Sequence, residues 1–257
     1  MLFRLLTLVF AAALAAAPQD AFAPTRKTAL FNGKNLDGWY TWLRENRYQD
    51  PKQVFSVVNG AIRISGEEWG GLATRRAYRD YHLTVEWRWG SKTWGNRERR
   101  ARDSGILIHC VGEDGAASGV WMESIESQII EGGTGDIILV GGKGRPSLTA
   151  AVREQGREIY WDRNGAPVTR NSGRIDWWGR SPEWKDEIGF RGLQDVEKPH
   201  GQWNRQEIYA RGDKLKYVLN GKVVNEAYNL SHRAGKIMIQ SEGAEIFVRK
   251  VEIKPAR

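Results

Sequence analysis

Two apolar stretches of this sequence are interrupted by side chains that can carry protons. They run from Asp103 to His109 (DSGILIH) and from Met122 to Glu131 (MESIESQIIE). Successive side chains of a β-strand point to opposite faces, so Glu126 and Gln128 share one face and lie roughly 7 Å apart along it. If the two stretches form neighbouring strands, His109 can lie beside Glu126. A carboxylate next to an imidazole is suited to general acid–base chemistry.

Glu131 and Gly105 add to this candidate site. Glu131 is out of phase with Glu126, and only a bulge or the end of the strand turns it to the same side. Gly105 shares its face with His109, and so small a residue leaves room for a ligand. We therefore take His109, Glu126 and Glu131 as catalytic candidates and Gln128 as a substrate-binding one. The alternative for Glu126 and Glu131 is a pair of solvated strand carboxylates.

The elements that must position these residues have the pattern of short strands. An Asn-Gly turn joins two apolar runs in 54–65 and again in 214–225, which is a strong hairpin signal. Residues 81–89 alternate cleanly between apolar and polar. Residues 132–200 show little regular patterning and are predicted to form long loops and short strands that cap a sheet. Segments of helical period are nearly missing, so we predict an all-β sandwich or jelly roll of antiparallel sheets.

The beginning of the chain has the composition of a secretory signal peptide. Residues 1–23 combine one early Arg with an apolar run too short to span a membrane, followed by small residues. Cleavage after Ala23 fits the small-x-small pattern, but Pro24 is a poor residue after a cut, so a site slightly upstream is the alternative. We expect one mature domain, 24–257, in the periplasm or secreted, with no membrane insertion after cleavage. The sequence leaves its oligomeric state open.

Composition narrows the class of ligand. The net charge is +8, but the basic residues concentrate only in 97–102 and are otherwise scattered, which disfavours nucleic acid as a partner. The single cysteine, Cys110, excludes an internal disulfide and is predicted to be a buried structural thiol. Twelve Trp are too many to be buried without some rings reaching the surface. A flat indole packs against the C–H face of a sugar, so a small carbohydrate is the leading ligand, with a Trp-rich core as the alternative.

The last strands contain three further substrate-binding candidates. Met238, Gln240 and Glu242 alternate on one face of their strand. Because the strand is flanked by core-like aliphatic residues, Gln240 and Glu242 are predicted to point into the same cleft; surface polar residues are the alternative. Arg249 binds a sugar hydroxyl in one interpretation and pairs with a carboxylate in the other.

The order of several motifs resembles the 3-keto-disaccharide hydrolase domain family, long catalogued as a domain of unknown function. The resemblance covers nearly the whole mature chain. Its motifs are Leu30–Trp39 (LFNGKNLDGW), Asp103–His109, Glu126–Glu131 (ESQIIE), Gly201–Asn204 (GQWN), Leu219–Lys222 (LNGK), and Gly235–Gly243 continuing to Phe247–Ile253. It implies a concanavalin A-like jelly roll whose concave face, under long loops, holds sugar. It also implies cleavage of glycosides oxidised to a ketone at sugar carbon 3.

A ketone at carbon 3 acidifies the proton on carbon 2, so a base can remove it and the group on carbon 1 leaves by elimination; water then adds to the alkene. This chemistry needs a base, a donor near the enolate oxygen and an acid for the leaving group. We assign Glu126 or His109 as base, Gln128 as donor, and Glu131 or Glu242 as acid. The sequence points to no cofactor with certainty; a divalent metal ion held by His109, Glu126 and Glu131, which would polarise the ketone, is the alternative.

Two alternatives belong to other classes of function. The spacing Glu126-x-Gln-x-x-Glu131 resembles the Glu-x-Asp-x-x-Glu of concanavalin-type retaining glycosidases, in which two carboxyls roughly 5–5.5 Å apart act as nucleophile and acid. Such an enzyme cleaves unoxidised glycosides. The other alternative is a carbohydrate-binding module without catalysis.

Overall fold

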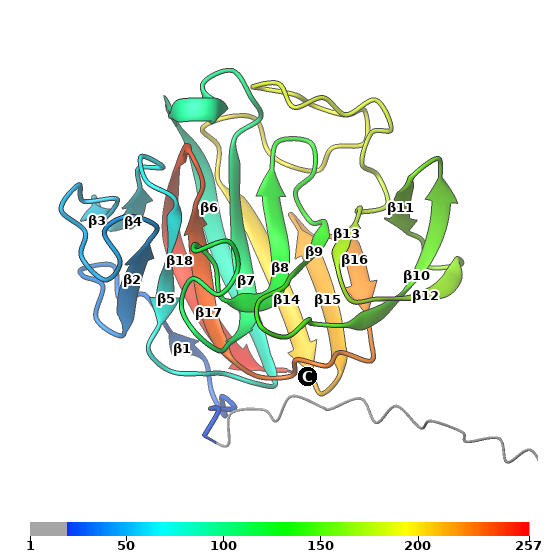
Figure 1. The fold of residues 1–257 in the computed structure, drawn as a ribbon, viewed down its shortest axis with the longest axis horizontal. Coiled ribbons are helices and arrows are strands. Elements are labelled where there is room, and N and C mark those ends of the chain that lie inside the picture. The colour runs from blue at the N-terminus through cyan, green and yellow to red at the C-terminus, as the bar shows by residue number, and fades with distance from the viewer. Residues whose placement is uncertain (1–19, 257) are drawn as a thin grey trace, which may run out of the picture.

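A computed structural model describes residues 20–256 of the chain. Residues 1–19 of the predicted signal peptide lie outside them. The described chain forms two antiparallel sheets packed face to face and a small third sheet at one side (Figure 1). Its regular structure consists of strands and one 3-10 turn, η1, at Gly95–Arg97, without an α-helix. This is the predicted all-β, concanavalin A-like jelly-roll sandwich.

The first sheet has the strand order β16-β15-β14-β6-β18-β4-β3, with β1 beside β18. Its bounds are β1 Thr28–Ala29, β3 Phe55–Val58, β4 Ala61–Ile64, β6 Tyr81–Thr93, β14 Asn204–Arg211, β15 Lys214–Leu219, β16 Lys222–Ala227 and β18 Ala244–Pro255. The second sheet has the order β13-β9-β8-β7-β17-β5-β2. Its bounds are β2 Trp39–Leu43, β5 Gly70–Thr74, β7 Asp103–Val111, β8 Glu123–Ile130, β9 Ile137–Val140, β13 Gly173–Ile175 and β17 Lys236–Ser241.

The hydrophobic core fills the space between the two sheets. Apolar side chains at alternate positions, such as Val85 and Trp87 of β6 and Ile106 and Ile108 of β7, are at most 1% exposed. The predicted Asn-Gly hairpins are present as β3–β4 and β15–β16, where both turn residues take the positive φ that such turns require.

Residues 132–200 contain more regular structure than expected. Besides β9 and β13 they form the third sheet, β11-β10-β12, from β10 Leu148–Gln155, β11 Glu158–Trp161 and β12 Ala166–Arg170. The remainder, from 176 onward, is loop.

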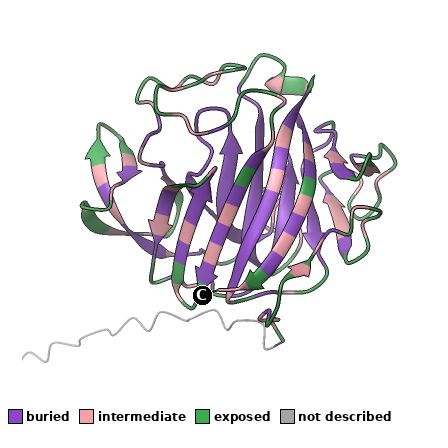
Figure 2. Ribbon diagram, turned by 180° about the vertical axis from the view of Figure 1, so that it is seen from behind, coloured by how far each residue is buried: buried purple, intermediate pink, exposed green. Residues whose placement is uncertain are grey.

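The outer faces of the two main sheets differ in exposure. On the first sheet, buried and exposed residues alternate along the strands, so that face meets solvent (Figure 2). On the second sheet every residue of β8 is buried. Loop residues cover it: Met122 packs with Leu107 and Met238, and Trp184 donates a hydrogen bond to the Glu131 carbonyl at 2.8 Å.

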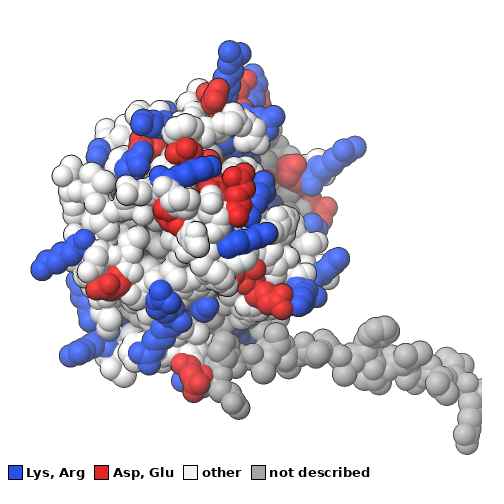
Figure 3. All heavy atoms as spheres, turned by 60° about the vertical axis from the view of Figure 1, so that its left-hand side comes forward, with Lys and Arg blue, Asp and Glu red and all other residues white. Residues whose placement is uncertain are grey.

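The surface charge is mixed. On the side drawn in Figure 3, Lys and Arg side chains are interspersed with Asp and Glu. Within the described residues no helix has the length and apolar character needed to cross a membrane.

Candidate functional site

The outer face of the second sheet brings four of the predicted polar residues onto one surface. In the β7–β8 register Leu107 lies opposite Glu126 and Gly105 lies opposite Gln128. In the β7–β17 register Met238 lies opposite Leu107. Residues opposite each other in antiparallel strands point to the same side, so Glu126, Gln128 and Gln240 share this face. Glu242 follows on the same alternation, just after β17 ends.

Gly105 creates the space in which two of these side chains meet. A methyl group at this position would collide with both Glu126 Oε1 and Gln240 Oε1. The glycine in the motif therefore accommodates the functional groups of its neighbours from β8 and β17. Glu126 is only 4% exposed and Gln240 1%. We call Glu126, Gln240, Asp103 and Glu242 the acid cluster.

Burial shifts the proton affinities of the acid cluster upward. Burial raises the pKa of Glu126 to about 8; the negative charge of Asp103 adds to the rise, whereas Arg174 and a hydrogen bond from Gln240 oppose it. Burial likewise raises the pKa of Asp103 to about 6 against the opposing charge of Arg97. The pKa of the half-buried Glu242 is raised well above its usual value by burial and by the neighbouring carboxylates. Crowded carboxyls of this kind share protons instead of all ionising.

Two buried acceptors of the cluster have nothing to bind. Within residues 20–256, neither Gln240 Oε1 nor Asp103 Oδ1 has a hydrogen-bond partner. The other oxygen of Asp103 pairs with Arg97, which also contacts Asp186 at 3.0 Å. Nearly all buried polar groups in proteins are hydrogen-bonded. Two acceptors left open beside a raised-pKa carboxyl therefore fit a ligand that brings its own hydroxyl donors.

His109 does not lie beside Glu126, contrary to the prediction. A bulge in β7 between Ile108 and Val111 gives His109 a φ of +51° and turns its side chain toward the interior. There its ring meets Tyr81 of the other sheet at 5.7 Å, and Nδ1 lies 2.8 Å from the His232 carbonyl oxygen. Burial lowers the pKa of His109 to about 4, so the imidazole stays neutral at ordinary pH.

Glu131 is also outside the acid cluster. It follows the last residue of β8, and its carboxylate pairs with the Arg102 guanidinium at 2.7 Å. The same carboxylate accepts backbone N–H groups of Arg102 and Gly189 at 2.9 and 2.8 Å. Its position connects the loop before β7 to the loop around residue 189. The predicted spacing with Glu126 thus produces no carboxyl pair.

The remaining candidates divide between the two sheets. Gln128 lies on the face of the acid cluster, but its Oε1 accepts a hydrogen bond from its neighbour Ile129 N at 3.1 Å. Arg249 lies on the solvent face of the first sheet, where Nε is 2.7 Å from Glu86 Oε2. Arg249 therefore pairs with a carboxylate, which is the second of the two interpretations given for it from the sequence. Cys110 is buried, as predicted.

The residues proposed for a metal site are apart in space, since His109 faces the interior and Glu131 is paired with Arg102. Across residues 20–256 no group of three or more His, Cys, Asp or Glu side chains is arranged to hold a metal ion.

Sequence reasoning missed Asp103, Arg97 and Arg174. Asp103 has the same parity as Gly105, so the alternation itself could have placed it on the face. Arg97 belongs to η1, and Arg174 comes from β13 and binds Asp136 at 2.8 Å. Only the folded chain brings these two arginines to the cluster.

A hollow of about 300 Å³ lies at the turn between β17 and β18. Trp69, Trp94 and Arg44 line it, and so does Gly243, the residue after Glu242. Arg44 lies over the Trp69 ring at 4.9 Å, and Trp69 stacks with Trp121 at 6.2 Å. All three indoles are half-buried. This hollow gives the acid cluster a neighbouring surface with the aromatic character of sugar-binding sites.

The architecture and the acid cluster define an all-β sandwich protein with a buried acidic site, and comparison with known proteins gives its family. The chain belongs to the family of the 3-keto-alpha-glucoside-1,2-lyase-like domain, whose model matches residues 26–254. Membership supports a function on carbohydrates.

Two solved structures share the fold, both titled as a putative glycosyl hydrolase from Parabacteroides distasonis ATCC 8503. The first has 17% identity and a TM-score of 0.53, covering 90% of this chain and 94% of that one. The second has 16% identity and a TM-score of 0.51, covering 90% and 100%. No curated protein matches the chain in sequence.

Proposed function

We propose that this chain is an exported enzyme that cleaves 3-keto-glycosides at the acid cluster, by elimination followed by addition of water. The observation that carries the proposal is the environment of the buried Glu126. Its pKa is raised to about 8, and among the described residues two buried hydrogen-bond acceptors of the same cluster have no donor. The family description supports the substrate class, and the signal-like residues 1–23 support export.

In the proposed reaction the ionised Glu126 removes the proton from sugar carbon 2. The C–H electron pair forms the double bond between carbons 1 and 2, conjugated with the ketone at carbon 3. The bond between carbon 1 and the glycosidic oxygen breaks, and Glu242 donates a proton to that oxygen. The first products are an unsaturated 3-keto-sugar and a free alcohol; water then adds across the double bond.

The pKa shifts support this division of roles. A carboxylate with a pKa near 8 is a much stronger base than an ordinary Glu, although only about one molecule in ten has it ionised at pH 7. Burial and the neighbouring carboxylates raise the pKa of Glu242, which favours its protonated form and so its role as the acid. The reactive form is the minority in which Glu126 is ionised while Glu242 keeps its proton, and one carboxylate acting with one carboxylic acid is a recurrent acid–base arrangement.

The hydroxyl groups of the substrate supply the hydrogen-bond donors that the acid cluster lacks. A donor from the sugar can bind Gln240 Oε1 and another Asp103 Oδ1, which satisfies both buried acceptors. The hollow at Trp69 and Trp94 then receives the leaving group, next to Glu242. Because Glu126 is 4% exposed, the proposal requires side chains over the acid cluster to move when substrate binds, and we expect Arg97, which pairs with Asp103, to be one of them.

The test is incubation with a 3-keto-glucoside and, in parallel, with its unoxidised parent glucoside, with release of the alcohol as the readout. Release from the ketone alone supports the proposal. Release from the unoxidised glucoside would favour a retaining glycosidase, and binding without release from either would favour a binding module.

A further inference from the structure

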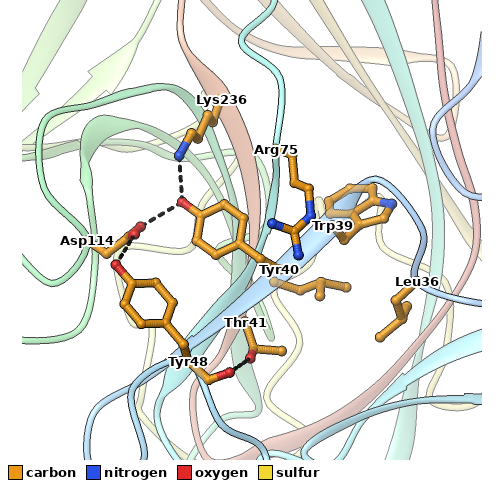
Figure 4. Close-up of a pocket in the computed structure, with 9 residues that line it drawn as sticks. Leu36, Trp39, Tyr40, Thr41, Tyr48, Arg75, Asp114 and Lys236 are labelled. Atoms are coloured by element: carbon orange, nitrogen blue, oxygen red, sulfur yellow. Dashed lines mark hydrogen bonds between the residues drawn. The ribbon is translucent and has the colours of Figure 1, made fainter.

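A second hollow, of about 610 Å³, lies at the β2 edge of the second sheet (Figure 4). Tyr40 of β2 lies in its centre, with Tyr48, Asp114, Lys236 and Arg75 around it. Strands β5, β17 and β7 separate β2 from β8. Since neighbouring strands lie about 4.8 Å apart, Tyr40 and Glu126 are separated by roughly 19 Å across the sheet. Lys236 of the hollow and Gln240 of the acid cluster share β17 but are four residues, or roughly 13 Å, apart along it, so the two sites are distinct.

The polar groups of this hollow are held in fixed positions. Both phenols donate to Asp114, Tyr40 at 2.7 Å and Tyr48 at 3.0 Å, and Lys236 Nζ donates to the Tyr40 oxygen at 2.8 Å. Figure 4 shows Asp114 between the two tyrosines, with the Lys236 ammonium on the other side of the Tyr40 hydroxyl. Burial and Asp114 raise the pKa of Tyr40 above its usual value, so the phenol remains neutral.

The two cations of the hollow have no anionic partner. Lys236 Nζ and the Arg75 guanidinium lie 4.5 and 5.9 Å from the centre of the Tyr40 ring. In the part of the chain that the structure describes, neither takes part in an ion pair within 4.0 Å. Asp114 uses its two oxygens on the phenols instead. Two cations and one carboxylate leave the hollow with a single positive charge.

The walls of the hollow are aromatic and partly open to solvent. Tyr48 is 62% exposed, and its ring lies 6.2 Å from that of Tyr40 at a tilt of 40°. Such rings pack against the C–H face of a pyranose, while hydroxyl groups of a sugar can donate to the remaining lone pairs of Asp114.

We propose that this hollow binds an acidic saccharide, with the carboxylate of a uronic acid between Arg75 and Lys236 and its ring against Tyr48. A monoanion matches the single positive charge. A phosphate dianion would bring a second negative charge toward Asp114. The site would let the protein hold an acidic polysaccharide away from the acid cluster, whatever reaction that cluster performs.

Calorimetric titration of the mature chain at pH 7 tests the proposal, with D-glucuronate, D-glucose and inorganic phosphate as separate ligands. Glucuronate should bind at least about tenfold more tightly than either of the others. The variant Arg75→Gln should lose about tenfold in glucuronate affinity, since a charge-assisted hydrogen bond is removed. The control is Arg76→Gln, because Arg76 is also exposed but lies over Phe22 at 4.0 Å.

Three results would overturn the inference. They are equal binding of glucose and glucuronate, tighter binding of phosphate, and equal loss of affinity in Arg75→Gln and Arg76→Gln. The outcome does not depend on the acid cluster, because Arg75→Gln should leave cleavage of a neutral 3-keto-glucoside unchanged.

Discussion

Replacing Gly105 by Ala would place a methyl group where the functional groups of Glu126 and Gln240 now lie. Both oxygens are buried, so the new methyl cannot be accommodated by moving a side chain into solvent. Either the carboxyl and the amide shift or the strands separate. The substitution thus displaces the proposed base without changing any ionisable group.

The expected losses of stability and activity in Gly105→Ala follow from the crowding around this residue. Overpacking a buried site by one methyl typically costs about 1–3 kcal/mol, partly offset by about 0.4–1 kcal/mol because Ala restricts the unfolded chain. A net loss of about 1–2 kcal/mol corresponds to a fall in Tm of roughly 3–6 °C for a chain of this length. Displacing the base by about 1 Å should lower kcat/KM for a 3-keto-glucoside on the order of a hundredfold.

Two other glycines serve as controls. At Gly141 an added methyl would meet nothing nearer than the Gly144 oxygen at 3.8 Å, so Gly141→Ala should be neutral. At Gly71 on β5 it would meet only the flexible side chain of Met238, so Gly71→Ala should lower Tm and spare most of kcat/KM. Wild-type kcat/KM in a folded Gly105→Ala chain, or an equal loss in Gly71→Ala, would refute the reasoning.

Other parts of the structure give further expectations. Glu131→Gln removes the charge paired with Arg102 and should lower the free energy of unfolding, measured with urea, by roughly 3 kcal/mol; a changed pH profile of kcat/KM would contradict its anchoring role. The pKa of His109 is lowered by burial from 6.5 to about 4, so the unfolded chain protonates first as the pH falls. Between pH 6.5 and pH 4 the free energy of unfolding of wild type should fall by about 3 kcal/mol more than that of His109→Asn. An equal fall in the two proteins would show that His109 is not the cause. Phe22 forms backbone hydrogen bonds with residues 77 and 79, so a chain starting at Thr25 should have a lower Tm than one starting at Asp20; an equal Tm would count against this contribution.

Local sequence patterns were enough to predict the β-sandwich fold and several of the residues that share the face of the acid cluster. Asn59-Gly60 fixes a hairpin turn by itself, and strict alternation places Glu126, Gln128 and Gln240 on one face because β8 and β17 are regular. The same alternation gave a wrong prediction for His109, whose side chain points to the interior and not toward Glu126. The bulge that turns it inward depends on the register of β7 with its neighbours, which no local pattern encodes.

Long-range partners account for the other differences. Glu131 is bound by Arg102 and by a backbone N–H from residue 189, and Arg249 lies near Glu86 on a different strand. The charges on the acid cluster depend on Arg97, which lies in a loop six residues before Asp103, and on Arg174, which is distant in the sequence. A single sequence shows neither the pairing of such residues nor the burial that raises the pKa of Glu126.

The pH profile of kcat/KM for a 3-keto-glucoside, compared between wild type and Glu126→Gln, tests the central claim most directly. A base must be ionised, so wild-type kcat/KM should rise about tenfold per pH unit up to about pH 8 and then stop rising, with a fall only where Glu242 loses its proton. The Glu126→Gln variant should have a kcat/KM at least about a hundredfold below that of wild type, and this kcat/KM should no longer rise with pH. The control variant Glu197→Gln changes another buried carboxyl, which accepts hydrogen bonds from Trp89 and Thr134, and it should keep the wild-type kcat/KM and its rise with pH. Undiminished cleavage by Glu126→Gln, or a wild-type kcat/KM that does not rise between pH 6 and pH 8, would contradict the role of Glu126 as the base.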